Sequence, residues 1–177
     1  MKVKQNKTGA AYWIKTLKLK PHPEGGFFRE IYRSAERIPS AALPARYRGT
    51  RTFSTSIYFL LAGTQISALH RLASDEQWYF YDGNTLHLTM IAPDGTLKST
   101  RLGRHANAGE QLQVVIPAKT WMGARLTDHG GYALIGCTVA PGFEFQDFEM
   151  GQRADLLARY PRRRKLILAL TRSCSLA

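Results

Sequence analysis

A succession of short strand-like runs between residues 52 and 140 constrains the fold of this chain more than any other feature. The runs are rich in β-branched and aromatic residues. Turn signals separate them, such as Asp-Gly at 82–83, Pro-Asp-Gly at 93–95 and Gly-Gly at 130–131. Strands at this spacing predict an all-β sandwich or barrel. We expect them at 52–61, 66–72, 76–81, 85–92, 96–102, 112–116, 121–127 and 132–140.

The flanking segments predict short helices and one long loop. Trp13 and Leu17 are four residues apart, which favours one face of a short helix that ends before Pro21. No repeat or linker divides the chain, so we expect a single domain over 1–177, with a barrel core at about 26–148 and a basic tail at 161–177. The other expected elements are a helix at 12–19, an edge-type strand at 27–33, a loop or flap at 34–50, and helices at 152–160 and 164–170.

The charge of the chain bears on its partners. The formal net charge is +12, and basic residues gather near both ends of the sequence. Solvated basic tails explain this pattern better than nucleic-acid binding, because no nucleic-acid-binding motif accompanies the charges. An anionic small ligand would also suit a basic protein.

Cysteine usage and apolar run length bear on location. Cys137 lies in an apolar run and Cys174 near the C-terminus, which indicates no disulfide framework. No apolar run has the length of a signal peptide or a membrane span. We therefore expect a soluble, cytoplasmic protein without a membrane partner.

The segment 70–83 concentrates the chemistry. On a strand that starts at Glu76, the side chains of Glu76, Trp78 and Phe80 share one face, because strand side chains alternate. A carboxylate on a face with two large aromatic rings indicates a cavity wall, where a histidine, water or ligand pairs with it. The alternative is an edge strand with its aromatic residues packed under a loop and Glu76 in water.

The same segment resembles the first conserved motif of the cupin superfamily. His70, Glu76 and Gly83 fall on the spacing of that motif, but Leu72 stands at its second histidine position. Of the second cupin motif only Pro117 remains. Its glycine, histidine and asparagine positions hold Lys119, Met122 and Leu126.

Longer stretches resemble one uncharacterised cupin subfamily, a domain of unknown function with a His-Pro-Glu-Gly-Gly motif. The matching stretches are 22–30, 56–61, 70–83, 117–121 and 136–143, extended by Phe145, Asp147 and Phe148. Lys119 departs from the glycine expected in this group. The resemblance implies a double-stranded β-helix (a jelly-roll barrel) with a ligand pocket, commonly in a homodimer.

The donor count at the motif positions favours a metal-free site without a cofactor. A catalytic metal needs three or four nitrogen or oxygen ligands, and the motifs supply only His70 and Glu76. His22 or Gln113 would have to complete the set in space.

The same two residues suit acid/base catalysis. His70 can exchange a proton near neutral pH, and Glu76, Asp75 or Asp147 would orient it. The metal-independent deoxysugar-nucleotide epimerases share the cupin barrel and add a tyrosine acid. The candidates for that tyrosine are Tyr58, Tyr79, Tyr81 and Tyr132. We predict an isomerase or epimerase of a sugar or nucleotide-like metabolite, and the alternatives are a non-catalytic module for a ring-shaped ligand or a metal-dependent cupin enzyme.

Several further residues are candidates for contact with a ligand. The glycines at 25–26 either cradle an anion with their amides or form a sharp turn, which we favour. Aromatic residues near the pocket either stack on a ring-shaped ligand or belong to the core. Cys137 is expected to be a buried small hydrophobe. The ligand-binding candidates are His22, Glu24, Arg29, Tyr58, Trp78, Gln113, Trp121, Phe145 and Asp147.

Overall fold

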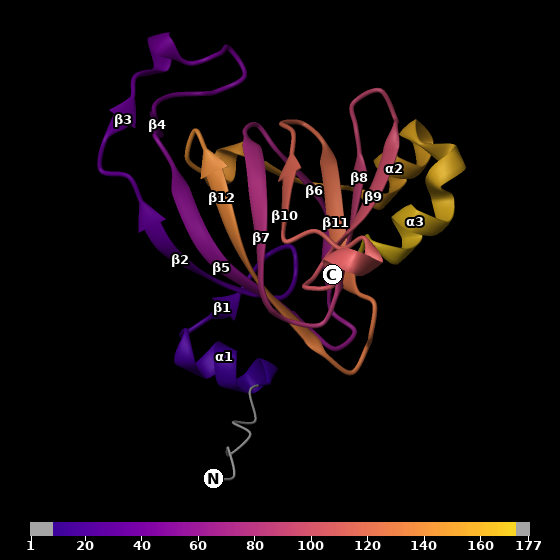
Figure 1. The fold of residues 1–177 in the computed structure, drawn as a ribbon. Coiled ribbons are helices and arrows are strands. Elements are labelled where there is room, and N and C mark those ends of the chain that lie inside the picture. The colour runs from indigo at the N-terminus through magenta and orange to yellow at the C-terminus, as the bar shows by residue number, and fades with distance from the viewer. Residues whose placement is uncertain (1–8, 173–177) are drawn as a thin grey trace, which may run out of the picture.

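Two antiparallel sheets form the body of the molecule in the computed structural model, which describes residues 9–172 (Figure 1). The first sheet has the order β1-β2-β5-β12-β7-β10 and the second the order β13-β6-β11-β8-β9. The first contains β1 (Lys20–Pro21), β2 (Phe27–Arg33), β5 (Thr55–Ala62), β7 (Asp75–Gly83), β10 (Gln113–Ile116) and β12 (Tyr132–Ala140). The second contains β6 (Ile66–Leu72), β8 (Leu86–Ile91), β9 (Leu97–Leu102), β11 (Trp121–Leu126) and β13 (Phe148–Met150). This is the expected cupin jelly roll with short helices.

The remaining elements lie outside the two sheets. The flap holds a two-stranded ribbon and a single 3-10 turn, and it extends beyond the end of the barrel (Figure 1). These elements are β3 (Arg37–Ile38), β4 (Arg51–Thr52), α1 (Ala10–Thr16), α2 (Arg153–Arg159), α3 (Arg164–Ala169), η1 (Ser40–Ala42), η2 (Ala106–Ala108), η3 (Phe145–Asp147) and η4 (Pro161–Arg163). Within residues 9–172, no helix is both long enough and apolar enough to span a bilayer.

The strand predictions agree closely with the structure, apart from one divided run and the short strands β1, β3 and β13, which were not predicted. The run expected at 52–61 divides, because β4 pairs with β3 in the flap whereas β5 pairs with β2 and β12. Strand β13 was not expected, since three residues show no periodicity. It forms because it can pair with β6, with Met150 opposite His70.

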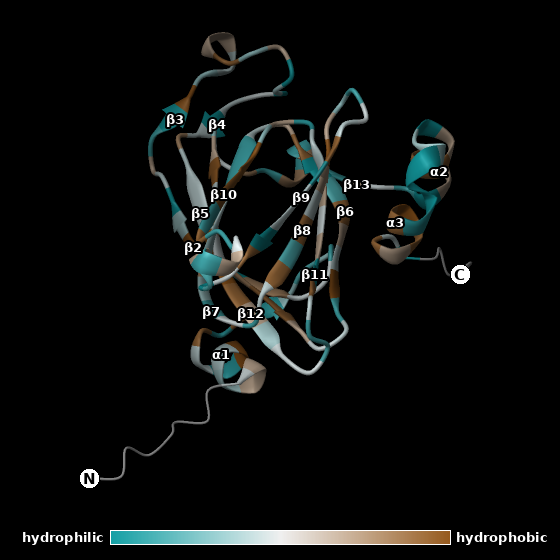
Figure 2. Cartoon of the chain, turned by 45° about the vertical axis from the view of Figure 1, so that its right-hand side comes forward, coloured by the Kyte–Doolittle hydropathy of each residue, from teal (hydrophilic) through white to brown (hydrophobic). Residues whose placement is uncertain are grey.

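Apolar side chains fill the space between the sheets. Others form two smaller clusters outside the sheets. Figure 2 shows apolar segments (brown) along the barrel strands and on α3. Leu156 of α2 and Ile167 of α3 pack with Trp121 on the outer side of the second sheet. Trp13 of α1 packs with Leu60 and Leu134 of the first sheet. The helices therefore cover outer surfaces and leave the barrel interior to the sheets.

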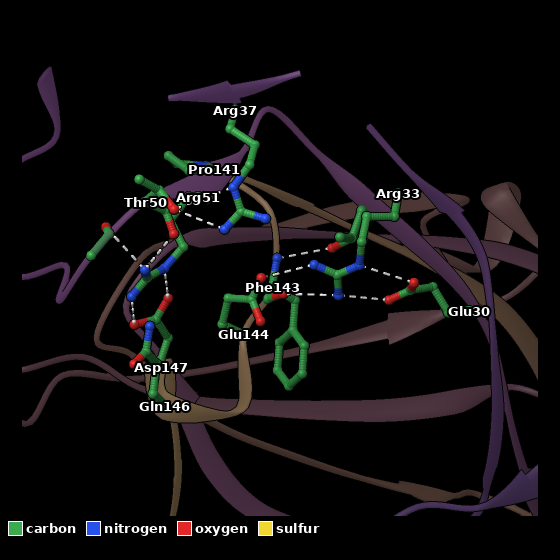
Figure 3. A network of polar contacts seen from close by, with 12 residues as sticks. Glu30, Arg33, Arg37, Thr50, Arg51, Pro141, Phe143, Glu144, Gln146 and Asp147 are labelled. Atoms are coloured by element: carbon green, nitrogen blue, oxygen red, sulfur yellow. Dashed lines mark hydrogen bonds and ion pairs between the residues drawn. The ribbon is translucent and has the colours of Figure 1, made fainter. Parts of the chain in front are cut away.

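A buried ion pair ties the flap to the barrel. Nε and Nη2 of Arg51 each lie 2.6 Å from a carboxylate oxygen of Asp147 (Figure 3). Tyr47 of the flap also shares a hydrogen bond of 2.9 Å with Ser74. The flap is thus held in place at its base, close to the segment that borders the cavity.

Candidate functional site

A cavity of about 90 Å³ lies between β2, β5, β7 and β12 of the first sheet and β6 of the second. Its interior walls carry His22, Glu24, His70, Glu76, Trp78 and Cys137, and its outer part is formed by Glu30, Arg33, Glu144 and Phe145. A buried water needs roughly 10–15 Å³ on this measure. The enclosed space therefore fits only a few water-sized groups, and a larger ligand would extend through the mouth.

Glu24 is the polar centre of the cavity. Its Oε2 lies 3.2 Å from Nε2 of His70 and 3.3 Å from Nδ1 of His22, and its Oε1 accepts a hydrogen bond of 2.8 Å from Ser67. Burial opposes ionisation, but the charge of His70 and the hydrogen bonds of His22 and Ser67 outweigh it and lower the pKa of Glu24. Glu24 is therefore a carboxylate at neutral pH.

The two glycines after Glu24 form the turn that places it. Gly25 has φ +117° and a Cβ there would lie 2.0 Å from the carbonyl oxygen of Ile66. Its amide donates to the carbonyl of His22 at 3.0 Å, and the amide of His22 donates to Gly26 at 3.1 Å. The Gly25 amide is therefore used within the turn, which supports the sharp turn that we favour over an anion cradle.

A bulge in β6 brings Ser67 and His70 to the same carboxylate. Residues three apart in a regular strand point to opposite faces. Here Met122 pairs with His70 and Ala124 with Ser67, so three steps along β6 face two along β11. Both side chains therefore reach Glu24.

The hydrogen bonds of His70 define where its protons lie. Nδ1 is 2.8 Å from the carbonyl oxygen of Ala68, which can only accept, so Nδ1 carries a proton. The contact of Nε2 with Glu24 then needs one more proton between them. Because the pKa of Glu24 is lowered, the favoured form is an imidazolium that donates to the carboxylate.

Glu76 is the second ionisable carboxyl of the cavity. Its side chain is buried, and no hydrogen-bond partner for its Oε2 occurs in the part of the chain that the structure describes. Burial raises the pKa of Glu76 to about 7, while the positive charge of His70 opposes this shift and the negative charge of Glu24 adds to it. The cavity therefore holds a carboxyl with one unpartnered oxygen, and this carboxyl changes charge near neutral pH.

The mouth of the cavity carries an ion-pair network (Figure 3). Arg33 donates to both oxygens of Glu30 at 3.0 and 2.8 Å and to Glu144 at 2.9 Å. It also donates to the carbonyl of Phe143 at 3.2 Å. One cation thus faces two carboxylates, and the entrance is not an attractive path for an anionic group.

Four of the candidate ligand-binding residues line the cavity, and five lie elsewhere. His22, Glu24, Trp78 and Phe145 are on its wall. Trp121 instead packs against α2 and α3, and Asp147 is paired with Arg51. The five candidates that lie outside the residues that line the cavity are Arg29, Tyr58, Gln113, Trp121 and Asp147. Strand alternation explains Arg29 and Tyr58, since their neighbours Phe28, Ile57 and Phe59 face inward.

The expected partners of His70 also change. Asp75 accepts a hydrogen bond from the amide of Ala118, and Asp147 binds Arg51, so neither orients the histidine. Glu24 does so instead. Tyr58, Tyr79, Tyr81 and Tyr132 are not among the residues that line the cavity, so the tyrosine acid of the epimerase analogy has no counterpart there.

Sequence reasoning missed the residues at the mouth and the role of Cys137. Alternation along β2 places Glu30 on the same face as Phe28, but Arg33 reaches that side only because the register shifts between Glu30 and Tyr32, which the sequence does not signal. Cys137 is buried as expected but forms part of the cavity wall. Burial and the neighbouring Glu76 raise the pKa of the Cys137 thiol well above its ordinary value, so it is no nucleophile at neutral pH.

The donors of the cavity do not fit a catalytic metal. Leu72 and Met122 occupy two of the motif positions, and both nitrogens of His70 are engaged in hydrogen bonds. Within residues 9–172, no group of three or more His, Cys, Asp or Glu side chains has the arrangement of a metal site. The residues present match hydrogen bonding and proton exchange better than coordination.

Comparison with known proteins agrees with this architecture. Residues 11–151 match the family model described as "Cupin superfamily (DUF985)". The crystal structure of protein SO0799 from Shewanella oneidensis is 40% identical with a TM-score of 0.83, over 93% of this chain and 98% of that one. A hypothetical protein from Leishmania major is 32% identical with a TM-score of 0.85, over 94% and 100%. The uncharacterized protein YML079W of Saccharomyces cerevisiae is 29% identical over 143 residues, which is 76% of this chain and 71% of the yeast protein.

Proposed function

Because this chain belongs to the cupin superfamily, in the family described as DUF985, we propose that its cavity binds a small molecule and moves protons within it without a metal. The observation that carries the proposal is the buried Oε2 of Glu76, which has no partner among the described residues and belongs to a carboxyl whose pKa is about 7. A group that is half ionised at neutral pH exchanges protons with least cost at that pH. It lies in one cavity with His70, which Glu24 orients.

The two groups have complementary roles in an isomerisation or epimerisation. The Glu76 carboxylate accepts a proton from a carbon next to a carbonyl group of the ligand. The His70 imidazolium gives the Nε2 proton that it shares with Glu24 to the carbonyl oxygen, and an enol results. Return of a proton to either carbon or either face gives the isomer and restores both groups. The hydrogen bond from Nδ1 to the carbonyl oxygen of Ala68 holds the ring of His70 in place throughout.

The ligand class follows from the walls and the size of the cavity. Trp78, Phe28, Phe143 and Phe145 provide aromatic surface for a ring-shaped molecule such as a sugar or nucleotide-like metabolite. The enclosed volume of about 90 Å³ admits only the reacting end of such a ligand. The uncharged remainder lies beside Phe145 at the mouth, and an anionic group of the ligand would have to lie away from Glu30 and Glu144.

The test is proton exchange in heavy water. Proton NMR of a panel of sugars, sugar nucleotides and keto acids in D₂O would record loss of C–H signals in the presence of the protein. We expect the rate to fall at least about 100-fold in Glu76→Gln and in His70→Ala, the size usual for loss of an acid or base. Glu36→Gln, a flap variant with an exposed side chain, should retain the rate. Exchange that persists in Glu76→Gln contradicts the proposal.

A non-catalytic binding module is the second candidate, and the aromatic wall favours it. Such a module would gain thermal stability from its ligand without any C–H exchange, because stabilisation by mass action needs no chemistry. Binding would then depend on Trp78 and Phe143 more than on Glu76. Calorimetry of Phe143→Ala beside Glu76→Gln separates the two candidates.

We also propose a cytoplasmic homodimer formed through the outer face of the first sheet. Leu112 and Val115 are 60% and 51% exposed beside β7, where Tyr81 is 48% exposed. Uncharged side chains in such a group are typical of a surface that a partner covers. Light scattering should give twice the chain mass, and Val115→Lys should give the monomer mass. A monomeric wild-type protein contradicts this proposal.

A further inference from the structure

We propose that a second, basic hollow on the flap side of β6 and β13 binds a phosphate-type oxyanion. The basic hollow is lined by Arg46, Arg48, Arg71, Lys119, Gln146 and Asp147, and its volume is about 550 Å³. It uses none of the ionisable residues of the cavity, and it meets the cavity only at a common wall of Leu72 and Phe148. The inference therefore goes beyond the proposed function.

The charge balance of the basic hollow favours an anion. Four cationic side chains line it, against Asp147 and Glu149. Both of these carboxylates are already paired. Asp147 accepts two hydrogen bonds of 2.6 Å from Arg51, and Glu149 accepts one of 2.7 Å from Arg71. Arg71 is itself used by Glu149, so the positive charges of Arg46, Arg48 and Lys119 remain available to a ligand.

Two of the guanidinium groups are held in place before any ligand binds. Arg46 donates from Nε to the carbonyl of Ala73 at 2.8 Å and lies 4.8 Å from the ring centre of Tyr47. Arg71 lies 4.5 Å from the ring centre of Trp121. Arginine presents several N–H donors in a fixed fork, so donors remain beyond these contacts. Pre-ordered donors bind an oxyanion at a smaller entropic cost.

Lys119 is the most informative residue of the hollow. Its φ is +65°, in the left-handed region that glycine favours, at the third position of the turn closed by the amide of Thr120 and the carbonyl of Pro117. The side chain is exposed, with no partner for its ammonium group in the described part of the chain. A strained lysine without a structural contact suggests a role for its charge in binding.

The position of the basic hollow also suits the charge of the cavity mouth. Glu30 and Glu144 outnumber Arg33 there, so an anionic group has no attractive site at the entrance. The basic hollow lies on the other side of the segment 144–149, whose residues Glu144 and Phe145 line the cavity and whose residues Gln146 and Asp147 line the hollow. Anion recognition is thereby separated from proton exchange.

The experiment is calorimetric titration with inorganic phosphate, in chloride buffers of matched ionic strength. Wild-type protein should bind phosphate, and Lys119→Gly and Arg48→Gln should each bind it about tenfold more weakly, as expected for one charge-assisted hydrogen bond. Lys119→Gly is chosen because glycine suits the positive φ, so its fold should be retained. Lys98→Gln removes the same charge from the exposed side of β9 and should bind like wild type.

Two further arms define the ligand and the independence of the site. Titrations with uridine 5′-monophosphate and with uridine distinguish two ligands, a phosphoryl group on a larger molecule and free phosphate. Only the phosphoryl group on a larger molecule predicts that the nucleotide binds more tightly than inorganic phosphate. Glu76→Gln should leave phosphate binding unchanged, so failure of the proposed function does not affect this result. Phosphate binding that is absent, or that Lys98→Gln weakens as much as Lys119→Gly does, overturns the proposal.

Discussion

Oε2 of Glu24 lies 3.2 Å from Nε2 of His70, and this contact joins the turn before β2 to strand β6 of the opposite sheet. Ser67 contacts the other carboxylate oxygen. One buried carboxylate therefore links the two sheets and orients the histidine at the same time. The following predictions test that dual role and the other features that shape the site.

Glu24→Ala should destabilise the protein by roughly 3 kcal/mol or more, because it leaves Ser67 and a charged His70 buried without their partner. Ser67→Ala removes a single neutral donor and should cost about 1 kcal/mol. Urea denaturation at pH 7 measures both free energies of unfolding. Equal losses in the two variants would show that the charge of His70 does not depend on Glu24.

Glu76 should make stability depend on pH. Its pKa is about 7 in the folded protein and near 4.5 when the chain is unfolded, so the folded state binds the extra proton between these values. The cost of ionising Glu76 is absent below about pH 4.5, grows between pH 4.5 and 7, and is complete above pH 7. The shift corresponds to roughly 3 kcal/mol.

The matched variant isolates this contribution. Glu76→Gln should equal wild type in stability near pH 4.5, apart from a constant offset, and should gain on it by up to roughly 3 kcal/mol as the pH rises to 8. Denaturation of both proteins over this range gives the difference at each pH. A difference that stays flat with pH would contradict the raised pKa.

Gly25→Ala should destabilise far more than the same change at another glycine with positive φ. A Cβ at Gly25 would lie 2.0 Å from the backbone oxygen of Ile66, whereas at Gly49 in the flap the nearest atom is 4.0 Å away. Gly49→Ala carries only the conformational cost, about 1 kcal/mol. Gly25→Ala also requires backbone movement, and we expect a loss of more than about 3 kcal/mol by thermal or urea unfolding. Similar losses at both sites would refute the tight turn.

Arg51→Ala should loosen the flap as well as destabilise the barrel. The side chain is fully buried, and its removal leaves Asp147 without its cation, which costs roughly 3–5 kcal/mol. Limited proteolysis should then cut within 34–50 earlier than in wild type. Arg37→Ala, which removes only an exposed contact with Thr50, is the control and should keep the wild-type cleavage pattern.

The fold was predictable because its signals are local. Strands β2, β6 and β12 coincide with the runs expected at 27–33, 66–72 and 132–140, since period and turn residues define them within a few positions. Strand β13 has no such signal, because only its pairing with β6 makes it a strand.

The site was predictable in part, for a different reason. Strand alternation and motif spacing place His70, Glu76 and Trp78 on the cavity wall, as the structure shows. The partner of His70 is Glu24, which is 46 positions earlier in the sequence, and no local pattern connects them. Asp147 has the carboxylate that a partner of His70 needs, but long-range packing pairs it with Arg51 instead.

The bulge in β6 has a consequence for how tolerant this site is of change. Ser67 and His70 reach one carboxylate only because β6 has one more residue between them than β11 has between their pairing partners Ala124 and Met122. A deletion of Ala68 or Leu69 would restore a regular ladder, keep every functional side chain in the sequence, and still turn Ser67 away from Glu24. A substitution in β6 therefore changes a single group of this cavity. An insertion or deletion in β6 changes which side chains reach Glu24.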